Sequence, residues 1–481
     1  MYFSDAFACK LPNPMAEPPS TDKLTDFSNR QSQAERGGLS RQLGLGSAVA
    51  AVAGESIAVG IFLTPAGMAR SLGSPFWLLV VWLAMGAMAL SGALCYGELA
   101  ARFPAAGGGY VYLREAYGPR LAFLYGWMSF LVLDPGVTAA LAVGMASYAA
   151  FIIGLSPGSM KVMAILTILV VAMLNIRHTQ LGAWFLRWMT TLKLSVLGLL
   201  AFWALAKGAG NWGHFLPFVP QRPGSEPLLA ALAGSYVAAF FSFGGWWDVS
   251  KIAGEVRDPK RTLPRALALG VLLVTTVYIL MSAVFIYVVP LSQVTSDETF
   301  VAQAGARVFG PAGGTLLALI VVACVLGGLA AIIMAAPRVY YAMARDGLFF
   351  PSVAKLHPRF GTPARAIGLH ALLASLIVTL GTFNQIIAYF VFVAVIFVGL
   401  TVAGLFRLKA VGRDERSFGF PWTAIIFLTL IVLLLVLLAM SNPWQALLGA
   451  GVVALGVPFY RRLHFKAEPP GNQNPSQTPV D

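Results

Sequence analysis

About twelve long apolar stretches dominate the sequence, and they limit the folds open to this chain. A membrane helix needs about 20 apolar residues, and its backbone polar groups must be paired inside the bilayer. The 481 residues are 58% hydrophobic and 11% charged, whereas soluble domains carry about 25% charged residues. We therefore predict an all-α integral membrane protein. The expected helices are Leu43–Ser71, Pro75–Ala101, Arg120–Phe151, Met160–Ile176, Trp184–Ala206, Leu228–Gly254, Arg265–Val289, Ala312–Ala344, Ala366–Phe383, Asn384–Leu408, Phe420–Met440 and Pro443–Tyr460.

The basic residues indicate the orientation of these helices. The net charge is +13, yet the basic residues fall in short loops rather than in a patch with interleaved aromatics, which argues against nucleic acid as a partner. Twelve helices place both termini on one side, and the loops on that side hold Arg102, the group Arg257–Arg265 and the group Arg461–Lys466. By the positive-inside rule this side is the cytoplasm. Multi-pass insertion in the cytoplasmic (inner) membrane is expected, with polar cytoplasmic tails at residues 1–42 and 463–481, the first disordered. We see no signal peptide.

Signatures of enzymes and metal centres are missing from the sequence. Cys9, Cys95 and Cys324 are far apart, which excludes a disulfide framework and gives no metal-ligand spacing. We find no GxSxG, HExxH or Walker A motif, and the five histidines are scattered. We expect neither an enzyme nor a bound cofactor or metal.

Glycines interrupt two of the apolar stretches. The first reads GESIAVGIFLTP from Gly54 to Pro65, and the sixth reads FFSFGGWWDVS with Gly244 and Gly245 at its centre. Each break begins a block of five helices, at residues 43–206 and 228–410. An odd number of helices separates the two breaks, so the blocks are expected to have opposite orientations in the membrane. Helices 11 and 12 follow at residues 420–462. Paired breaks in inverted halves are a sequence pointer to a transporter binding site.

Four motifs carry a family resemblance. They are GIFLTPAGM from Gly60, ALCYGELAARFPAAGGGYVYLREAYGP from Ala93, FFSFGGWW followed by GEVRDPKRTLPRA from Phe240, and PRVYYAMARDGLFFPSVAKLHPRFGTPARA from Pro337. In this order, across about Gly44 to Pro458, they resemble amino-acid permeases of the amino acid–polyamine–organocation (APC) superfamily, and most of all the L-type (LAT-like) exchangers. The resemblance implies a LeuT-type fold of five-plus-five inverted repeats, broken helices 1 and 6, and alternating access.

The resemblance also implies where substrate binds. The carboxylate would lie on backbone N–H groups of the first break, and the amine on carbonyls of the sixth helix, where Phe241 would be the gating aromatic. Val59 departs from the small or hydroxyl residue usual in the family, and Trp247 should narrow the pocket. The alternative for the first break is a glycine that only packs against another helix. The expected substrate-binding residues are Ala58, Val59, Gly60, Ile61, Phe241, Ser242, Phe243, Gly244, Gly245 and Trp247.

Lys193 lies in the middle of an apolar helix, too far from its ends for simple snorkelling. A buried amine is therefore favoured. The position matches the fifth-helix lysine of LAT-like permeases, which implies that the amine takes the place of a sodium ion and bridges the first and eighth helices.

Three carboxylates, Glu55, Asp134 and Asp248, fall at membrane depth, where an ionisable residue is a functional candidate. In one interpretation Glu55 pairs with Lys193 and Asp134 caps a helix near Pro135. In the other, the three acids against one lysine leave a charge of −2, which either protons or a cation must offset.

The sequence thus predicts a secondary amino acid transporter, either an exchanger or proton-linked, that is independent of sodium and takes small or medium neutral amino acids. One alternative is a transporter of cationic amino acids or polyamines, and another is a membrane sensor that binds an amino acid without moving it. The resemblance raises the question of a glycoprotein (heavy-chain) subunit, which animal L-type exchangers attach through a cysteine before the fourth helix. This chain has GLSPGSM there. We expect no such subunit; the amino acid and membrane lipid are the expected partners.

Overall fold

The computed structural model describes residues 41–57, 60–177, 179–294, 299–310, 312–380, 383–411, 419–441 and 443–464. Within these ranges the chain is helical, with no strand beyond a single bridge between Leu43 and Val256. Nine helical segments of the described part are long and apolar enough to cross a membrane. The prediction of an all-α membrane protein is confirmed.

The first half contains two interrupted helices. The broken first helix consists of α2 (Leu45–Ser56) and α3 (Gly60–Leu72), and the third passes through a π-helical turn. The elements up to the central loop are α4 (Pro75–Arg102), α5 (Gly109–Tyr117), α6 (Pro119–Met128), η1 (Ser129–Leu133), α7 (Asp134–Ile153), α8 (Pro157–Arg177), α9 (Thr179–Ala206) and η2 (Trp212–Phe215).

The second half repeats the pattern of a broken leading helix. Here α10 (Leu228–Phe243) is followed, after two glycines, by a 3₁₀ segment, η3 (Trp246–Glu255). The remaining elements are α11 (Pro259–Val288), η4 (Leu291–Gln293), α12 (Thr299–Phe309), α13 (Gly313–Ala335), α14 (Pro337–Arg345), η5 (Pro351–Ala354), α15 (Ala364–Leu380), α16 (Phe383–Val411), α17 (Trp422–Ser441) and α18 (Pro443–His464).

Several boundaries differ from the sequence prediction, and two of these differences have identifiable reasons. The helix expected from Arg265 begins at Pro259, because a proline fits the first helical turn, where its missing N–H is not needed. The helix expected to run unbroken from Arg120 to Phe151 contains the π turn of η1 immediately before Pro135. A proline cannot donate the usual backbone hydrogen bond, and the turn places Asp134 at the start of α7.

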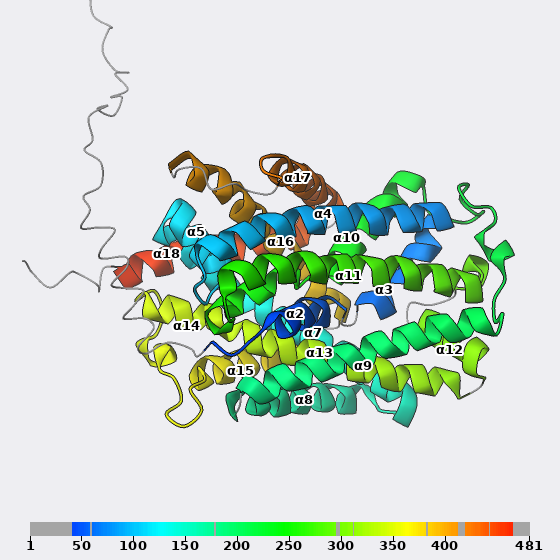
Figure 1. Cartoon of the computed structure of the whole chain (residues 1–481), viewed down its shortest axis with the longest axis horizontal. Helices are drawn as coiled ribbons and strands as arrows, with labels where there is room; N and C mark the ends of the chain where they lie inside the picture. The colour runs from blue at the N-terminus through cyan, green and yellow to red at the C-terminus, as the bar shows by residue number, and fades with distance from the viewer. Residues whose placement is uncertain are drawn as a thin grey trace, which may run out of the picture. The chain divides into compact units, whose positions relative to one another are not determined.

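Helices at the same place in the two expected blocks pack against each other. The second and seventh, α4 and α11, lie side by side (Figure 1). The third packs against the eighth (α7 on α13), the fourth against the ninth (α8 on α15), and the two broken helices meet through α3 and α10. This pairing fits the LeuT-type fold, in which an internal repeat brings counterparts together. The division into repeats at 43–206 and 228–410 stays a prediction.

A buried ion pair fixes the far end of η3. Nε of Arg338, at the start of α14, lies 2.7 Å from Oε1 of Glu255, and both side chains are buried. The backbone N–H groups of Gln42 and Leu43 donate to the carbonyl of Glu255. The beginning of the first helix, the end of η3 and α14 are therefore joined at one point, and η3 is held at both ends.

Candidate functional site

The two helix breaks meet each other, and glycines allow the contact. Gly245 adopts φ +95°, a left-handed conformation that side chains disfavour. A Cβ atom there would lie 2.5 Å from Cγ of Glu55, on α2. A Cβ on Gly60 would lie 2.6 Å from Cα of Ser242. The end of α2 thus abuts the second break, and the start of α3 abuts α10.

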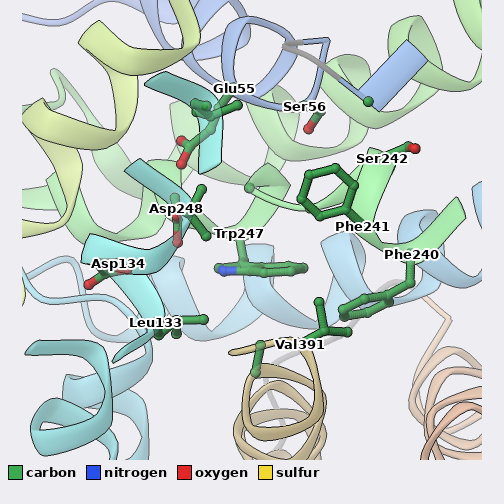
Figure 2. Close-up of a pocket in the computed structure, with 16 residues that line it drawn as sticks. Glu55, Ser56, Leu133, Asp134, Phe240, Phe241, Ser242, Trp247, Asp248 and Val391 are labelled. Atoms are coloured by element: carbon green, nitrogen blue, oxygen red, sulfur yellow. The ribbon is translucent and has the colours of Figure 1, made fainter. Parts of the chain in front are cut away.

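A cavity of about 60 Å³ lies at these breaks. One water-sized group needs about 10–15 Å³ on this measure, so the cavity has room for roughly four to six such groups. Figure 2 shows the acidic residues on one side of it and the phenylalanines on the other. Its lining consists of Glu55, Ser56, Gly60, Leu133, Asp134, Val137, Leu141, Phe240, Phe241, Ser242, Gly244, Gly245, Trp247, Asp248, Val391 and Ala394.

Six of the ten expected substrate-binding residues line this cavity: Gly60, Phe241, Ser242, Gly244, Gly245 and Trp247. Ala58 and Val59 lie outside the described residues.

Ile61 and Phe243 are buried and are not part of the cavity lining, and their assignment to substrate binding stays a prediction. The ring of Phe243 packs against Trp82 and Tyr278 instead, with centroids 6.1 and 5.0 Å away.

Aromatic rings form one wall of the cavity. The indole of Trp247 stacks against the ring of Phe240, with centroids 5.9 Å apart and planes at 27°. Phe241 also faces the cavity from α10 (Figure 2). This wall is apolar and rigid, and it limits the size of a ligand beside the breaks.

Tyr278, on α11, connects the two broken helices through backbone oxygens. Its hydroxyl lies 2.6 Å from the carbonyl of Ser56 and 2.7 Å from the carbonyl of Ser242. A tyrosine hydroxyl has one hydrogen. It can donate to either carbonyl, but not to both at the same moment.

Lys193 is buried and binds backbone oxygens at the end of α2. Its Nζ donates to the carbonyls of Gly54 and Ile57, each at 2.7 Å, and lies 3.5 Å from the carbonyl of Cys324 on α13. The last carbonyls of a helix lack partners within it, and the amine satisfies them. The first and eighth helices are bridged as the resemblance implied. Lys193 is not among the cavity-lining residues, and its hydrogen bonds go to carbonyls rather than to Glu55, so the suggested Glu55–Lys193 pair is wrong.

A second buried lysine, which the sequence analysis overlooked, organises the acidic side. Nζ of Lys251 lies 2.7 Å from Oδ1 of Asp134 and 2.8 Å from Oδ1 of Asp248. Asp134 also accepts a hydrogen bond from Ser129 at 2.5 Å. Its carboxylate therefore pairs with a lysine across the bundle instead of capping α7 near Pro135. The charge balance against Lys193 alone was also wrong, since two lysines face the three acids.

Glu55 completes this acidic side. Its carboxyl group points toward that of Asp248 (Figure 2). Among the described residues, Oε1 of Glu55 has no hydrogen-bond partner, although the atom is buried. The same side chain lines the cavity. Asp134 and Asp248 line it as well, so all three acids border the space that a ligand would occupy.

A further buried network lies behind Asp134. The hydroxyl of Tyr340, on α14, is 3.1 Å from Nδ1 of His370, on α15, and Oγ1 of Thr138 is 2.9 Å from Nε2 of the same ring. This network could not be predicted from the sequence, because its members come from three distant segments. Within the described ranges, no three His, Cys, Asp or Glu side chains are grouped so as to hold a metal ion.

Comparison with known proteins matches residues 43–452 to the model of the amino acid permease family. The chain is 30% identical to the human b(0,+)-type amino acid transporter 1 over 436 residues, 89% of each chain. It is 29% identical to the serine/threonine exchanger SteT of Bacillus subtilis (strain 168), over 80% of this chain and 88% of that one. It is 27% identical to the rat large neutral amino acids transporter small subunit 2, over 91% and 84%.

Proposed function

This chain belongs to the amino acid permease family, and from that premise we propose that it exchanges small neutral amino acids by alternating access, without a sodium ion. It is a multi-pass membrane transporter of amino acids. The proposal extends to substrate size, sodium independence, orientation and subunit composition, and it includes no catalytic activity.

The cavity between the helix breaks is the observation that carries the proposal. A free amino acid has an anionic and a cationic end on one carbon atom. The first N–H groups of a helix have no intrahelical partner, and this end carries positive partial charge. Gly60, at the start of α3, therefore offers donors for a substrate carboxylate. The carbonyls of Ser56 and Ser242, near the ends of α2 and α10, offer acceptors for the ammonium group.

Cavity size favours small substrates. About 60 Å³, bounded by the stacked rings of Trp247 and Phe240, suits a side chain of a few heavy atoms. The similarity to a bacterial protein named a serine/threonine exchanger supports the same size class and exchange as the mode of transport.

Lys193 supports sodium independence. Its ammonium group occupies the point where carbonyls of α2 and α13 converge. In the family that the sequence resembles, this is the place of a sodium ion in sodium-coupled members. Because the ammonium group of Lys193 supplies a positive charge at this point, a sodium ion is not needed there.

Orientation and partners complete the proposal. The basic loops favour cytoplasmic termini in the inner membrane. One relative is named a small subunit, which raises the question of a second subunit. The segment from Gly154 to Met160, between α7 and α8, contains no cysteine through which such a subunit could be linked, and we propose that the chain works alone.

Exchange in proteoliposomes tests the proposal. Vesicles containing the purified chain alone and loaded with serine should take up labelled alanine, and empty vesicles should take up far less. Replacing sodium with choline should leave the rate unchanged. Saturable binding without exchange would favour a sensor. Inhibition by arginine or putrescine, but not by serine, would favour the cationic alternative.

A further inference from the structure

Glu55 and Asp248 form a contact that needs a proton. The carboxyl group of Glu55 points toward that of Asp248 (Figure 2). Two ionised carboxylates only accept hydrogen bonds, so a hydrogen bond between these groups requires a proton on one of them. Both side chains are buried, at 6% and 4% exposed. Sharing one proton is the usual solution for two carboxyl groups in close contact.

Charge balance leads to the same number of protons. The buried site holds the acids Glu55, Asp134 and Asp248 and the lysines Lys193 and Lys251. Three negative and two positive charges leave one negative charge, and uncompensated charge at the centre of a membrane protein is costly. One bound proton makes the group neutral.

We propose that Glu55 and Asp248 together form a proton-binding site open to the substrate cavity, and that the proton is bound together with a neutral amino acid. The proposal rests on the proposed function, which supplies the substrate. Both side chains line the cavity. Asp248 is held by Lys251 at 2.8 Å, so Glu55 is the member that contacts the substrate. Asp248 holds the proton from the other side.

Lys251 keeps the rest of the cluster in place. It pairs with Asp134 and Asp248 at 2.7 and 2.8 Å, so each of these aspartates already has a cationic partner. Glu55 has no ion-pair partner in the described part of the chain, and the missing charge is therefore localised at the Glu55–Asp248 contact.

Within the described part of the chain, each other acid near the pair already has a cationic partner. Asp134 on α7 is held by Lys251 and Ser129, Glu255 on η3 pairs with Arg338 on α14, and Glu98 on α4 pairs with Arg102 and Lys409. The other buried titratable groups on the elements around Glu55 and Asp248 are Lys193 on α9, Tyr278 on α11, Cys324 on α13 and Tyr96 on α4, with Tyr125, Tyr340 and His370 behind Asp134.

Glu55→Gln is a mimic of the protonated site. A glutamine amide can donate an N–H to Asp248 and keeps an oxygen facing the cavity. With Glu55 neutralised, two acids balance two lysines without a proton. Asp248→Asn gives the same balance from the other member of the pair and serves as a second variant if the first does not fold. Glu98→Gln is the matched control, since Glu98 pairs with Arg102 and Lys409 and does not line the cavity.

Alanine binding to the purified full-length chain tests the proposal. Calorimetry from mildly acidic to mildly alkaline pH, in two buffers of different ionisation enthalpy, gives the affinity and the protons taken up. If a proton is bound with alanine, wild-type affinity falls as pH rises, by up to about tenfold per pH unit once the pair has lost its proton. Glu55→Gln should keep the acid-range affinity at every pH and take up no proton. Glu98→Gln should behave as the wild type.

Several results would overturn the proposal while leaving amino acid transport intact. These are alanine affinity that does not change with pH in the wild type, or a pH dependence that persists in both Glu55→Gln and Asp248→Asn. Loss of arginine binding alone in Glu55→Gln, with the alanine profile unchanged, would make the pair a site for cations.

An infrared measurement separates the proton site from the function. At mildly acidic pH without substrate, the wild type should show the band of a protonated carboxyl group, and Glu55→Gln should lose it. If alanine neither binds nor exchanges, the proposed function fails, and this band still decides whether the pair holds a proton. An unchanged band in Glu55→Gln refutes the proton site directly.

Discussion

Lys251 and Asp134 form an ion pair of 2.7 Å between η3 and α7, and each side chain is 1% exposed. The pair joins the second helix break to the third helix, next to the π turn of η1. The position of η3, and with it the acidic side of the cavity, therefore depends on a charge pair shielded from water.

Lys251→Met should destabilise the protein strongly. Removing one partner of a buried ion pair leaves an uncompensated charge and typically costs about 3–5 kcal/mol, and here two aspartates lose their partner. The midpoint of thermal unfolding in detergent should fall sharply. Lys409→Met, which removes a more exposed ion pair with Glu98, should have a small effect, about 1 kcal/mol or less. Adding Asp134→Asn to Lys251→Met should recover part of the loss, and no recovery would argue against the pairing.

Lys193→Met should abolish exchange without unfolding the chain. The carbonyls of Gly54 and Ile57 would lose their donor, at about 1–3 kcal/mol for each buried group, and no cation would remain at the end of α2. The rate of alanine exchange in proteoliposomes should fall by at least about tenfold, which corresponds to an increase of about 1.4 kcal/mol or more in the activation free energy. The eluted protein should stay monodisperse. Strong sodium dependence of the wild type would contradict the role given to Lys193.

Trp247→Ala should widen the range of substrates. The indole forms part of the wall against which Phe240 stacks, and its removal enlarges a cavity of about 60 Å³. The ratio of leucine to alanine exchange should rise by about tenfold or more, because a few methylene groups in an apolar pocket are worth that much. Loss of exchange for every amino acid would show that Trp247 supports η3 rather than limiting substrate size.

Gly60→Ala should separate the two broken helices. The added methyl group would lie 2.6 Å from Cα of Ser242, where Thr64 and Ser242 now share a 2.7 Å hydrogen bond. Overpacking of this kind costs about 1–3 kcal/mol, and exchange should fall with stability. Gly198→Ala, in α9, has no heavy atom within 4 Å of the added carbon and should be neutral or slightly stabilising. Equal effects of the two substitutions would contradict the close contact.

The membrane fold and the helix breaks could be predicted because each depends on a local pattern. Long apolar runs define the spans, and Gly244 and Gly245 interrupt one of them. Lys193 could be predicted as buried because it lies far from both ends of its helix. Each of these inferences depends only on the positions of residues within a single helix, which can be counted in the sequence.

Lys251 could not be placed as readily. In the sequence it lies three residues before the end of the expected helix Leu228–Gly254, near the basic run that begins at Arg257, and no role was assigned to it. The structure shows a 3₁₀ segment there, in which side chains three residues apart eclipse each other, so Asp248 and Lys251 align. The spacing was available in the sequence, but the second partner, Asp134, comes from another helix.

The direction of the Phe243 side chain could not be predicted for a related reason. Helical phase can be counted along an intact helix, but it is lost where a helix stops, and α10 ends at Phe243. Which of Phe241, Ser242 and Phe243 faces the cavity then depends on how Tyr278 and Trp82 pack beneath the break. That packing involves segments more than 30 residues away in the sequence.

The hydroxyl group of Tyr278 has one hydrogen, and two backbone carbonyls, one at each helix break, lie close enough to accept it. Ser56 and Ser242 each present a carbonyl within reach of that hydroxyl, and whichever carbonyl does not receive the hydrogen has one donor too few. An unsatisfied buried oxygen raises the free energy of the empty site. A substrate ammonium group brings three hydrogens to this place. Binding of the ligand would therefore provide hydrogen-bond donors for the carbonyls of Ser56 and Ser242 at the same time.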